Sequence, residues 1–575
     1  MPKLLRAIVI WLLCICAVGV IYAPAQTFTT LLTFNGQNGA NPDYVSLFQG
    51  TDGNLYGTAE AGGATANCSG GCGTVFNIST AGSLSVLHDF CSASECNSDG
   101  EFPKAGVIQS LDGNYYGTTW GSSVTGFGSV FQMTSAGTLT TLYTFCSLAN
   151  CADGYWPTAP LVQGTDGNFY GTTTSGGTGY ENSGGTIFKI TSTGALTTLY
   201  SFCSQTNCTD GMNPLGGLVQ ASDGNFYGTT NQGGTNSVCD GGCGTVFRIT
   251  PAGALTTLYN FCSKKNCTDG TNPMAGVIQA TNGDLYGTTF GGGKNGSGAI
   301  FKISLSGKFS VFYSFCAESS CSDGETPYAP VLQASDGNFY GTTNYGGVSG
   351  NGVIFEITSA KKLTVLYNFD SDNFGPVSPL MQDTNGTFYG TTFNGGANVD
   401  CLNSGGCGTV YSLSEGLGPF VKTEPSFGTV GSTVIIIGTN LTGTTAVNFD
   451  ATAATFQVVS SSEITATVPS KAKTGIVSVT TPSGTLKTLV DFKVIPIITT
   501  FTPESGPVGT EVTITGTGLT GATEVTFGGV KATTFKVISG GEVTADVPTG
   551  AETGVIAITT AGGTATSSQT FTVTE

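Results

Sequence analysis

Short runs of alternating apolar and polar residues recur along residues 28–414, separated by segments rich in Gly, Asn, Asp and Ser. Four kinds of run follow one another in a fixed order. Clear copies are A (PLVQG, 160–164), B (FYGTT, 169–173), C (GTIFKIT, 185–191) and D (LTTLYSF, 196–202). A period of two with β-branched and aromatic residues predicts strands, so this pattern predicts an all-β protein.

Each kind of run occurs seven times, which defines a repeat of about 50–60 residues. An Asp-Gly or Asn-Gly pair between runs A and B predicts a tight hairpin. A second short turn, such as TSTG at 191–194, joins run C to run D. The repeat therefore predicts a four-stranded antiparallel meander, which is the shape of a propeller blade.

One copy of run D is displaced. FTTLLTF at 28–34 precedes the first run A, and no run D follows the last run C near residue 414. We expect residues 28–34 to complete the last blade, because ring closure removes exposed sheet edges. The sequence thus predicts a seven-bladed β-propeller over residues 26–414. A linear β-solenoid is the alternative, but it does not require a displaced strand.

These repeats resemble the GloVer tandem-repeat family of secreted, choice-of-anchor bacterial proteins. The resemblance rests on the signature DGNxYGTT…GG…GTxFKIT and covers about residues 28–414. It implies export and a repeat fold, and it implies no particular activity. The chain ends in TFTVTE, so we expect no apolar anchor of the kind that anchored members carry.

After a linker at 415–420, an internal duplication occupies residues 421–495 and 496–575. The copies are marked by EPSFGTVGSTVIIIGTNLTG from Glu424 and TPESGPVGTEVTITGTGLTG from Thr502. Both resemble IPT/TIG domains, which have an immunoglobulin-like fold, and their length suits a small β-sandwich. We expect two such sandwiches that act as spacers or interaction modules.

The N-terminus carries Lys3 and Arg6, then a nearly continuous apolar stretch, then APA at 23–25. This order is typical of a cleaved secretory signal peptide, here residues 1–25. A transmembrane anchor is the alternative, but the apolar stretch is short for one. We expect a secreted protein that is extracellular, periplasmic or loosely surface-associated, with no membrane span in the mature chain.

The charge balance restricts the kind of partner. The formal net charge is −18, and only 10% of the residues are charged. Nucleic-acid binding requires basic patches that neutralise phosphates, so the composition argues against it. It also argues against electrostatic docking on anionic lipid. A neutral or cationic ligand fits an acidic chain better.

Of the 18 cysteines, Cys14 and Cys16 precede the predicted cleavage site, and the others fall in closely spaced pairs. An even count in an exported protein indicates disulfides. Zinc is the alternative, but its sites favour CxxC spacings and histidine partners, which the pairs lack, so we expect no metal and no cofactor. The predicted disulfides are Cys68–Cys72, Cys91–Cys96, Cys146–Cys151, Cys203–Cys208, Cys239–Cys243, Cys262–Cys267, Cys316–Cys321 and Cys401–Cys407.

The two ends of a meander differ in their loops. The A–B and C–D turns share one end, which we call the short-turn face. The B–C and D–A loops share the other end, the long-loop face, and are longer, more variable and rich in cysteine. Variable loops on a rigid scaffold commonly carry function, so we expect a ligand to bind at the long-loop face.

The long-loop face also holds the candidate site residues. Packing under their own loops is the alternative for its aromatic rings, and it is favoured for Trp156, which precedes a proline. A glycosidase requires two carboxyl groups at a set separation, which sequence alone does not give. Candidates for stacking on sugars are Trp120, Trp156, Tyr180, Phe290 and Tyr345. Weak candidates for catalysis are the non-repeated acids Glu60, Glu101, Glu181 and Glu325.

Other polar residues are predicted to be structural. The only histidine, His88, replaces the tyrosine of other D runs, and the lack of a second histidine argues against His-based catalysis. The tyrosine of run B and the glutamine of run A occur in all seven repeats, as packing between blades requires. A turn-forming role is expected for the acids that follow the D–A cysteine pairs, Asp99, Asp153, Asp210, Asp269 and Asp323.

The leading hypothesis is a non-catalytic extracellular binding or adhesion protein whose partner is a glycan or surface polymer. It rests on the acidic, histidine-poor chain, the disulfide-rich loop face and the two tandem domains. One alternative is a polysaccharide-active hydrolase or lyase that uses loop carboxylates. The other is a structural protein of an envelope or matrix. The pattern leaves the oligomeric state open.

Overall fold

The computed structural model describes residues 26–575 except 45, 65–67, 69, 92–98, 111, 122–125, 180–183, 399–400 and 402–404. The predicted signal peptide therefore lies outside the described residues. Regular structure in the described part is almost entirely β-strand, and its helices are short 3-10 turns. These turns are η1 (Ala149–Cys151), η3 (Thr206–Cys208), η4 (Lys265–Cys267) and η5 (Ser319–Cys321). None of the helices in these ranges is long and apolar enough to cross a membrane.

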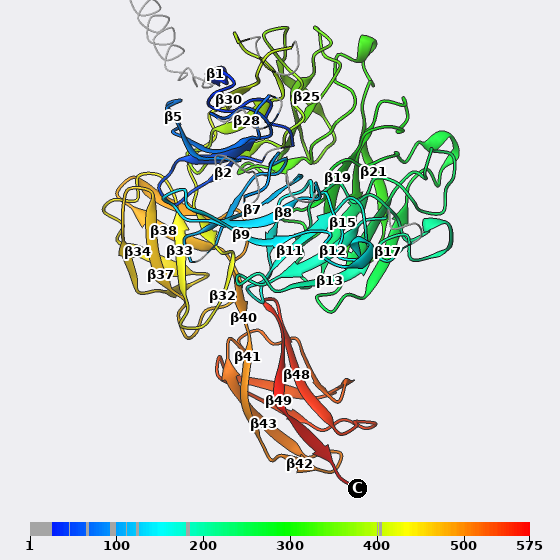
Figure 1. Cartoon of the computed structure of the whole chain (residues 1–575). Helices are drawn as coiled ribbons and strands as arrows, with labels where there is room; N and C mark the ends of the chain where they lie inside the picture. Colours follow the sequence, from blue (N-terminus) through cyan, green and yellow to red (C-terminus); the bar gives the residue numbers. More distant parts are fainter. Residues whose placement is uncertain are drawn as a thin grey trace, which may run out of the picture.

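Each repeat forms one four-stranded antiparallel sheet, and the described residues before 415 form seven of them (Figure 1). We number the repeats 1–7 in chain order. Repeats 1–3 are β2 (Phe48–Gln49), β3 (Leu55–Ala59), β4 (Thr74–Ile78) and β5 (Leu84–Asp89); β6 (Ile108–Gln109), β7 (Tyr115–Thr119), β8 (Ser129–Met133) and β9 (Leu139–Thr144); and β10 (Val162–Gln163), β11 (Phe169–Thr173), β12 (Thr186–Ile190) and β13 (Leu196–Ser201).

The later repeats keep the same order of strands. Repeats 4–6 are β14 (Val219–Gln220), β15 (Phe226–Thr230), β16 (Thr245–Ile249) and β17 (Leu255–Asn260); β18 (Ile278–Gln279), β19 (Leu285–Thr289), β20 (Ala299–Ile303) and β21 (Phe309–Ser314); and β22 (Leu332–Gln333), β23 (Phe339–Thr343), β24 (Val353–Ile357) and β25 (Leu363–Asn368). Repeat 7 is β27 (Met381–Gln382), β28 (Phe388–Thr392), β30 (Thr409–Ser414) and β1 (Thr27–Thr33), and a small extra sheet pairs β26 (Asn373–Phe374) with β29 (Asn394–Gly395).

Run A is shorter than the strand of five or more residues that its sequence predicts. Only two of its residues pair with run B, as Val162 and Gln163 pair with Tyr170 and Phe169. The earlier residues of run A line the centre of the ring instead, where a strand partner has no room. The prediction of a full-length strand A was therefore wrong.

Neighbouring sheets cover both faces of each strand B, which explains its continuous apolar and Thr composition. All five residues of β11 are buried, and Phe169 stacks on Tyr116 of the preceding repeat at 4.1 Å between ring centroids. The glycine within run B is required by close packing. A Cβ on Gly171 would lie 2.5 Å from the ring of Phe188 on the next strand, closer than two carbon atoms approach.

A circuit of glutamine side chains joins the repeats at the short-turn face. Gln49 of repeat 1 donates from Nε2 to Thr384 Oγ1 of repeat 7 at 2.9 Å, and its Oε1 accepts from Thr384 N at 3.2 Å. Because the link between repeats 7 and 1 matches the others, the sheets form a closed ring. The remaining links are Gln109 to Thr51, Gln163 to Ser110, Gln220 to Thr165, Gln279 to Ser222, Gln333 to Thr281 and Gln382 to Ser335.

The first strand of the described chain completes the last sheet. β1 pairs antiparallel with β30, so that Thr27 lies opposite Ser414 and Thr33 opposite Thr409. Its Phe28 stacks on Tyr367 of repeat 6 with ring centroids 3.6 Å apart. The strand starts and ends one residue earlier than the run at 28–34. The two ends of the repeat region thereby share one sheet.

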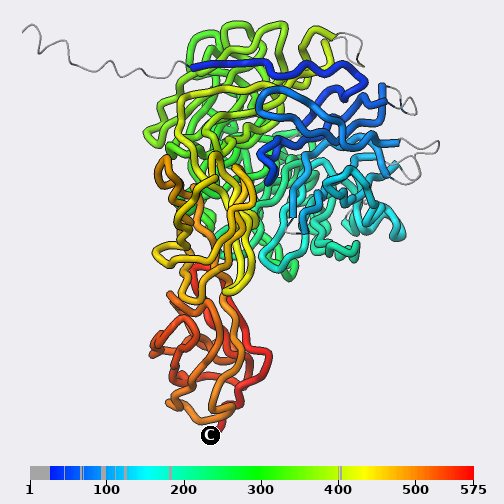
Figure 2. Tube along the Cα trace, turned by 90° about the vertical axis from the view of Figure 1, so that its left-hand side faces the viewer, coloured from blue at the N-terminus to red at the C-terminus, as the bar shows by residue number. Residues whose placement is uncertain are grey.

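Two β-sandwiches follow the ring, and Figure 2 shows the first between the ring and the second. Their cores include the ring contacts Phe449–Phe492 and Phe527–Phe571. The first contains β31 (Lys422–Glu424), β32 (Phe427–Thr429), β33 (Thr433–Ile437), β34 (Ala446–Phe449), β35 (Thr452–Ala453), β36 (Phe456–Val458), β37 (Glu463–Thr467), β38 (Val477–Thr481), β39 (Gly484–Lys487) and β40 (Lys493–Ile495). The second contains β41 (Ile497–Thr502), β42 (Ser505–Gly506), β43 (Glu511–Thr517), β44 (Glu524–Phe527), β45 (Val530–Lys531), β46 (Phe535–Ser539), β47 (Glu542–Asp546), β48 (Gly554–Thr560) and β49 (Gly563–Val573).

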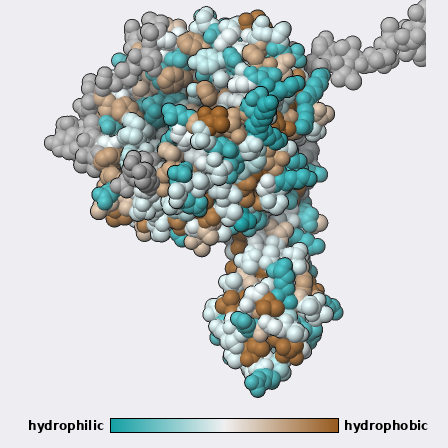
Figure 3. Space-filling model, turned by 90° about the vertical axis from the view of Figure 1, so that its right-hand side faces the viewer, coloured by the Kyte–Doolittle hydropathy of each residue, from teal (hydrophilic) through white to brown (hydrophobic). Residues whose placement is uncertain are grey.

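The first sandwich docks on the short-turn face of the ring. Lys422 donates from Nζ to the carbonyl of Gln49 at 3.0 Å, and Ser462 donates to the carbonyl of Thr51 at 2.9 Å. Lys493 donates to the carbonyl of Ala221 in repeat 4 at 2.9 Å. Repeat 4 lies three steps from repeats 1 and 7, so this domain crosses the centre of the ring. The second sandwich projects as a narrower stalk (Figure 3).

Candidate functional site

Disulfides secure the loops of the long-loop face. Seven of the eight predicted pairs are bonded in the described residues, with Cα–Cα distances from 4.0 to 5.3 Å. Cys91 is also disulfide-bonded, and its predicted partner Cys96 lies outside the described residues. Bonded sulfurs offer no thiolate to a metal, so the cysteines serve to hold these loops.

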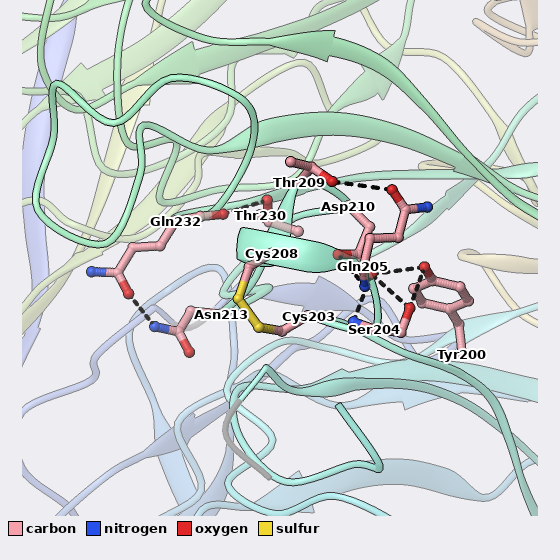
Figure 4. Close-up of a disulfide and its surroundings, with 10 residues drawn as sticks. All are labelled: Tyr200, Cys203, Ser204, Gln205, Cys208, Thr209, Asp210, Asn213, Thr230 and Gln232. Atoms are coloured by element: carbon pink, nitrogen blue, oxygen red, sulfur yellow. Dashed lines mark hydrogen bonds between the residues drawn. A yellow bond between two sulfur atoms is a disulfide. The ribbon is translucent and has the colours of Figure 1, made fainter. Parts of the chain in front are cut away.

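A buried aspartate supports five of the seven D–A loops. In repeat 3, Asp210 accepts hydrogen bonds from Tyr200 Oη at 2.8 Å and from Ser204 N at 3.0 Å, beside the Cys203–Cys208 disulfide (Figure 4). Asp153, Asp269 and Asp323 accept equivalent bonds. The carboxylate therefore organises the turn, as its repetition predicts.

His88 belongs to the same arrangement. Its Nε2 lies 3.1 Å from Asp99 Oδ2, the atom that also accepts a hydrogen bond from Cys91 N at 3.0 Å. A tyrosine hydroxyl makes this contact in repeats 2–5. His88 is thus a substitute for tyrosine that keeps the structural hydrogen bond.

The centre of the long-loop face is where the repeats differ most. Each D–A loop ends in a proline, and six of the seven prolines pack on the glycine before strand C of the preceding repeat, as Pro214 does on Gly185. The next residue differs in all seven repeats, although the backbone around it is repeated. These residues are Asp43, Lys104, Thr158, Leu215, Met274, Tyr328 and Val377.

A cavity of about 180 Å³ lies on the axis of the ring, and five of these seven residues line it, all except Asp43 and Lys104. Tyr44 and Tyr328 stand on its wall with their ring centroids 6.2 Å apart. Leu215, Met274 and Val377 supply apolar lining. The cavity therefore combines apolar walls with a few hydroxyl groups, which is the usual composition of a small-ligand pocket.

A cluster of three charged residues lies next to Tyr44. Lys104 Nζ is 3.1 Å from Glu60 Oε1 and 3.9 Å from Asp43 Oδ2, so the cluster joins repeats 1 and 2. Burial, together with the nearby Glu60, raises the pKa of Asp43 to about 7, although Lys104 opposes the shift. Asp43 and Glu60 are hydrogen-bonded to each other. The cluster therefore presents both donors and acceptors while holding at most one excess negative charge.

Two tryptophans extend this cluster. Lys104 lies over the ring of Trp120 at 5.1 Å, and Trp120 stacks on Trp156 with ring centroids 5.1 Å apart and planes 20° apart. The indole of Trp156 donates to the carbonyl of Gly126 at 3.0 Å. The loop thus does hold Trp156, as the alternative interpretation expected, while its ring also continues the aromatic surface of Trp120.

The backbone at Trp156 is strained. Its φ is 60°, in the left-handed region that Asn and Gly tolerate and that is costly for bulky residues. The equivalent position holds Asn41, Asn213 and Asn272 in repeats 1, 4 and 5, and Phe102 and Thr326 in repeats 2 and 6, with φ between 50° and 57°. The left-handed turn is therefore part of the repeat, and Trp156, like Phe102 and Thr326, occupies it at a cost in backbone energy.

The other candidates lie in different places. Phe290 packs on Tyr328 at 5.2 Å beside the cavity, whereas Tyr345 is 52% exposed. Tyr180 and Glu181 lie outside the described residues. Glu101 lies against Cys68 Sγ at 3.2 Å, and Glu325 lies near Ser297 Oγ at 3.4 Å in another repeat.

The candidate acids do not form a glycosidase pair within the described residues. Glu60, Glu101 and Glu325 belong to repeats 1, 2 and 6, and the carboxyl group that approaches Glu60 is that of Asp43. These two are in hydrogen-bond contact, closer than the roughly 5–9.5 Å that retaining and inverting glycosidases use. The geometry therefore suits ligand binding better than glycoside hydrolysis.

The model of the Gloeobacter/Verrucomicrobia repeat matches residues 17–240 and 234–456. The chain belongs to this repeat family. The IPT/TIG domain model matches residues 421–494 and 496–573, so this chain carries two such domains after its repeats. A search of the curated proteins finds no match.

Solved structures that match this repeat protein do so at low identity and low TM-score. A surface glycan-binding protein from Prevotella bryantii is 18% identical, with 27% of this chain and 39% of that one covered and a TM-score of 0.21. A fungal alcohol oxidase in complex with copper is 12% identical, with 81% of this chain and 98% of that one covered and a TM-score of 0.43. An aldose sugar dehydrogenase from Streptomyces coelicolor is 13% identical, with 68% of this chain and 98% of that one covered and a TM-score of 0.32. The chain thus spans about two fifths of the glycan-binding protein.

Sequence reasoning missed part of the site in this repeat protein. Asp43, Tyr44, Lys104 and Tyr328 line or border the cavity, yet none was singled out. Two signals in the sequence identify them. The position after the loop proline varies while its neighbours repeat, and repeat 1 has one extra residue between its proline and its glutamine, Pro42–Gln49 against Pro103–Gln109.

Proposed function

We propose that this protein is a secreted, non-catalytic binding protein that recognises a neutral glycan or surface polymer through the centre of the long-loop face. The observation that carries the proposal is the stacked Trp120–Trp156 pair beside the charged cluster of Lys104, Glu60 and Asp43. Export is supported by the many local disulfides, which persist in oxidising surroundings.

The chemistry of the site matches that of a sugar. A pyranose ring has an apolar face of C–H groups, which packs well on an indole, and an edge of hydroxyl groups, which need both donors and acceptors. Lys104 supplies donors, and the carboxyl groups of Glu60 and Asp43 supply acceptors. An acidic chain of net charge −18 favours a ligand that is not itself anionic.

The position of the first IPT/TIG domain supports the choice of face. This domain occupies part of the short-turn face through Lys422, Ser462 and Lys493. The long-loop face lies at the opposite end of the ring. A ligand held there would be presented away from the two domains.

A hydrolase or lyase remains the alternative function, and the site argues against it in two ways. The acids at the centre are in contact with each other rather than separated across a substrate. The one histidine is committed to Asp99. Release of reducing ends or unsaturated products from a polysaccharide would nevertheless favour the enzyme.

The test is a screen of the protein from residue 26 onwards against an array of neutral, acidic and amino polysaccharides. We expect retention on at least one neutral polysaccharide. The variant Trp120→Ala should lose at least tenfold in affinity, about 1.4 kcal/mol, because the stacking surface is halved. The control Val238→Ala, at an exposed side chain in the B–C loop of repeat 4 on the same face, should bind as the wild type does.

Two outcomes would overturn the proposal. One is binding that Trp120→Ala leaves unchanged, which would place the ligand elsewhere. The other is self-assembly of the protein without retention on any polysaccharide, which would favour a structural role in an envelope or matrix.

A further inference from the structure

We infer that the axial cavity holds the terminal ring of a neutral glycan chain, so that the protein recognises chain ends rather than internal segments. This inference rests on the proposed function and specifies the part of the glycan that is bound. It follows from the size of the cavity, its covered inner end and the groups at its rim.

The size of the cavity fits one ring. Its volume is about 180 Å³, and a cavity of about 150 Å³ accepts a benzene molecule. Pockets that hold several rings are larger, from about 300 Å³ upwards. One pyranose can therefore enter, and the next unit of the chain must lie outside on the loops.

The wall of the cavity is continuous from repeat to repeat, and its inner end faces the short-turn side, which the first IPT/TIG domain covers through contacts with repeats 1 and 4. The backbones of repeats 4 and 5 touch at Gly216 and Gly276, where a Cβ on Gly216 would lie 2.1 Å from the nitrogen of Gly276. A Cβ on Gly106 would likewise lie 2.2 Å from the carbonyl oxygen of Ser46 in repeat 1. Further along the axis come the glutamine circuit and the first IPT/TIG domain. A polymer therefore has no route through the ring.

The rim of the cavity carries groups that can bind a terminal sugar. Tyr44 and Tyr328 present aromatic surface, and burial with the nearby Asp43 raises the pKa of Tyr44, so its hydroxyl remains a donor. Asp43 and Glu60 act electrostatically on Tyr44, and Lys104 pairs with both of them, so this charged cluster borders the tyrosine on the cavity wall. A terminal ring has a free hydroxyl that an internal ring uses in its glycosidic bond, and this cluster can pair with it.

The Trp120–Trp156 pair then has a distinct role outside the cavity. Trp156 belongs to the D–A loop that leads into repeat 3, two residues before Thr158 of the cavity wall, and the pair extends the contact that Lys104 makes with Trp120. A chain whose last ring occupies the cavity would lay its second or third ring on these indoles. The cavity would select chain ends, and the tryptophans would add affinity.

The direct test uses defined probes and the unmodified protein. Oligosaccharide ladders of β-1,4-glucan, β-1,4-xylan, β-1,4-mannan and β-1,3-glucan, with their parent polysaccharides, are titrated by calorimetry. For the glycan that binds, we expect affinity per chain to be constant within about threefold beyond the trisaccharide, under 1 kcal/mol. We also expect binding capacity per mass to fall as chains lengthen, because fewer ends are present.

Matched variants test the cavity itself. Thr158→Trp fills the cavity from repeat 3, and Val377→Phe fills it from repeat 7 as an independent substitution. Each should lose at least tenfold in affinity. The control Thr193→Trp adds the same side chain at an exposed C–D turn of the short-turn face and should bind as the wild type does. A variant counts only if its circular dichroism and melting temperature match those of the control.

The outcomes separate this inference from the proposed function. Affinity that rises with chain length, together with cavity-filled variants that bind normally, would overturn the inference and leave the binding function standing. Absence of binding to every ladder and polysaccharide would overturn both. Length-independent affinity that the cavity-filled variants lose would establish recognition of chain ends.

Discussion

At the short-turn end of the ring every repeat contributes the same glutamine to the same kind of hydrogen bond, whereas at the long-loop end the residue after the proline differs in all seven repeats. The two ends are built on one backbone. Residues that repeat serve the contacts that repeat, between adjacent sheets. Residues that differ do not make these repeated contacts between sheets, and they lie where the loops converge on the axis.

The two ends also differ in what covers them. The first IPT/TIG domain lies on the short-turn face and touches repeats 1 and 4 through main-chain carbonyls. The long-loop face instead displays a cavity, two stacked indoles and three charged groups. Changes at the first end should therefore alter stability, and changes at the second should alter binding.

The largest effect is expected from removing β1. Deleting residues 26–33 opens the ring at repeat 7 and exposes β30 and the ring of Tyr411. The loss of three apolar side chains and a row of hydrogen bonds should cost about 4 kcal/mol or more, measured by urea unfolding. Phe28→Ala should cost about half as much. An unchanged unfolding midpoint would rule out closure of the ring by this strand.

Next comes a comparison of two repeated aspartates at opposite ends. Asp153→Ala in a fully buried site leaves Tyr143 Oη and Ser147 N without their acceptor and should cost about 2–3 kcal/mol. Asp166→Ala, in an exposed A–B turn, removes the acceptor of Tyr170 Oη and should cost under about 1 kcal/mol. Thermal unfolding of both variants checks the difference, and equal losses would contradict the assigned roles.

A smaller effect concerns pH. Burial raises the pKa of Asp43 from 3.8 to about 7, so the folded state retains a proton that the unfolded state releases first. Stability attributable to Asp43 should therefore fall as pH rises from about 4 to 7 and stay level above that. Asp43→Asn should remove roughly 2 kcal/mol of this decline in the free energy of unfolding. The figure is smaller than the full pKa shift implies, because Glu60 and Lys104 share the interaction. Parallel curves for variant and wild type across this range would refute the effect.

The smallest change in stability should accompany a clear change in binding. Trp156→Asn restores the residue that repeats 1, 4 and 5 carry at this left-handed position. Relief of strain offsets the lost stacking on Trp120, so unfolding free energy should change by less than about 1 kcal/mol. Glycan affinity should fall at least tenfold. Trp156→Ala does not relieve the backbone strain and should be less stable than Trp156→Asn. An unchanged glycan affinity in either variant would show that the indole is structural.

Much of the fold could be predicted because repetition reveals it. Seven copies of each run indicated four-stranded units, and the displaced run at 28–34 indicated which sheet it joins. The short strand A could not be predicted, because pairing of only two residues follows from crowding at the axis. A pattern of period two does not report that crowding.

The candidate site could be predicted only in part. Glu60, Trp120 and Trp156 were recognisable as non-repeated residues in long loops. Their contacts with Asp43 and Lys104 cross from one repeat to the next, and such contacts exist only once the ring forms. The choice between a turn-forming and a ligand-binding acid likewise depended on their partners, because Asp153 accepts hydrogen bonds within its own loop whereas Asp43 pairs with Lys104 of the next repeat.

The most direct test of the difference between the two ends is hydrogen–deuterium exchange of the protein with and without a neutral polysaccharide that it retains. Protection is predicted in the D–A loops that carry Lys104 and Trp156, and no change is predicted in the A–B turns around Thr51 and Ala221. Protection confined to those turns or to the IPT/TIG domains would contradict binding at the long-loop face.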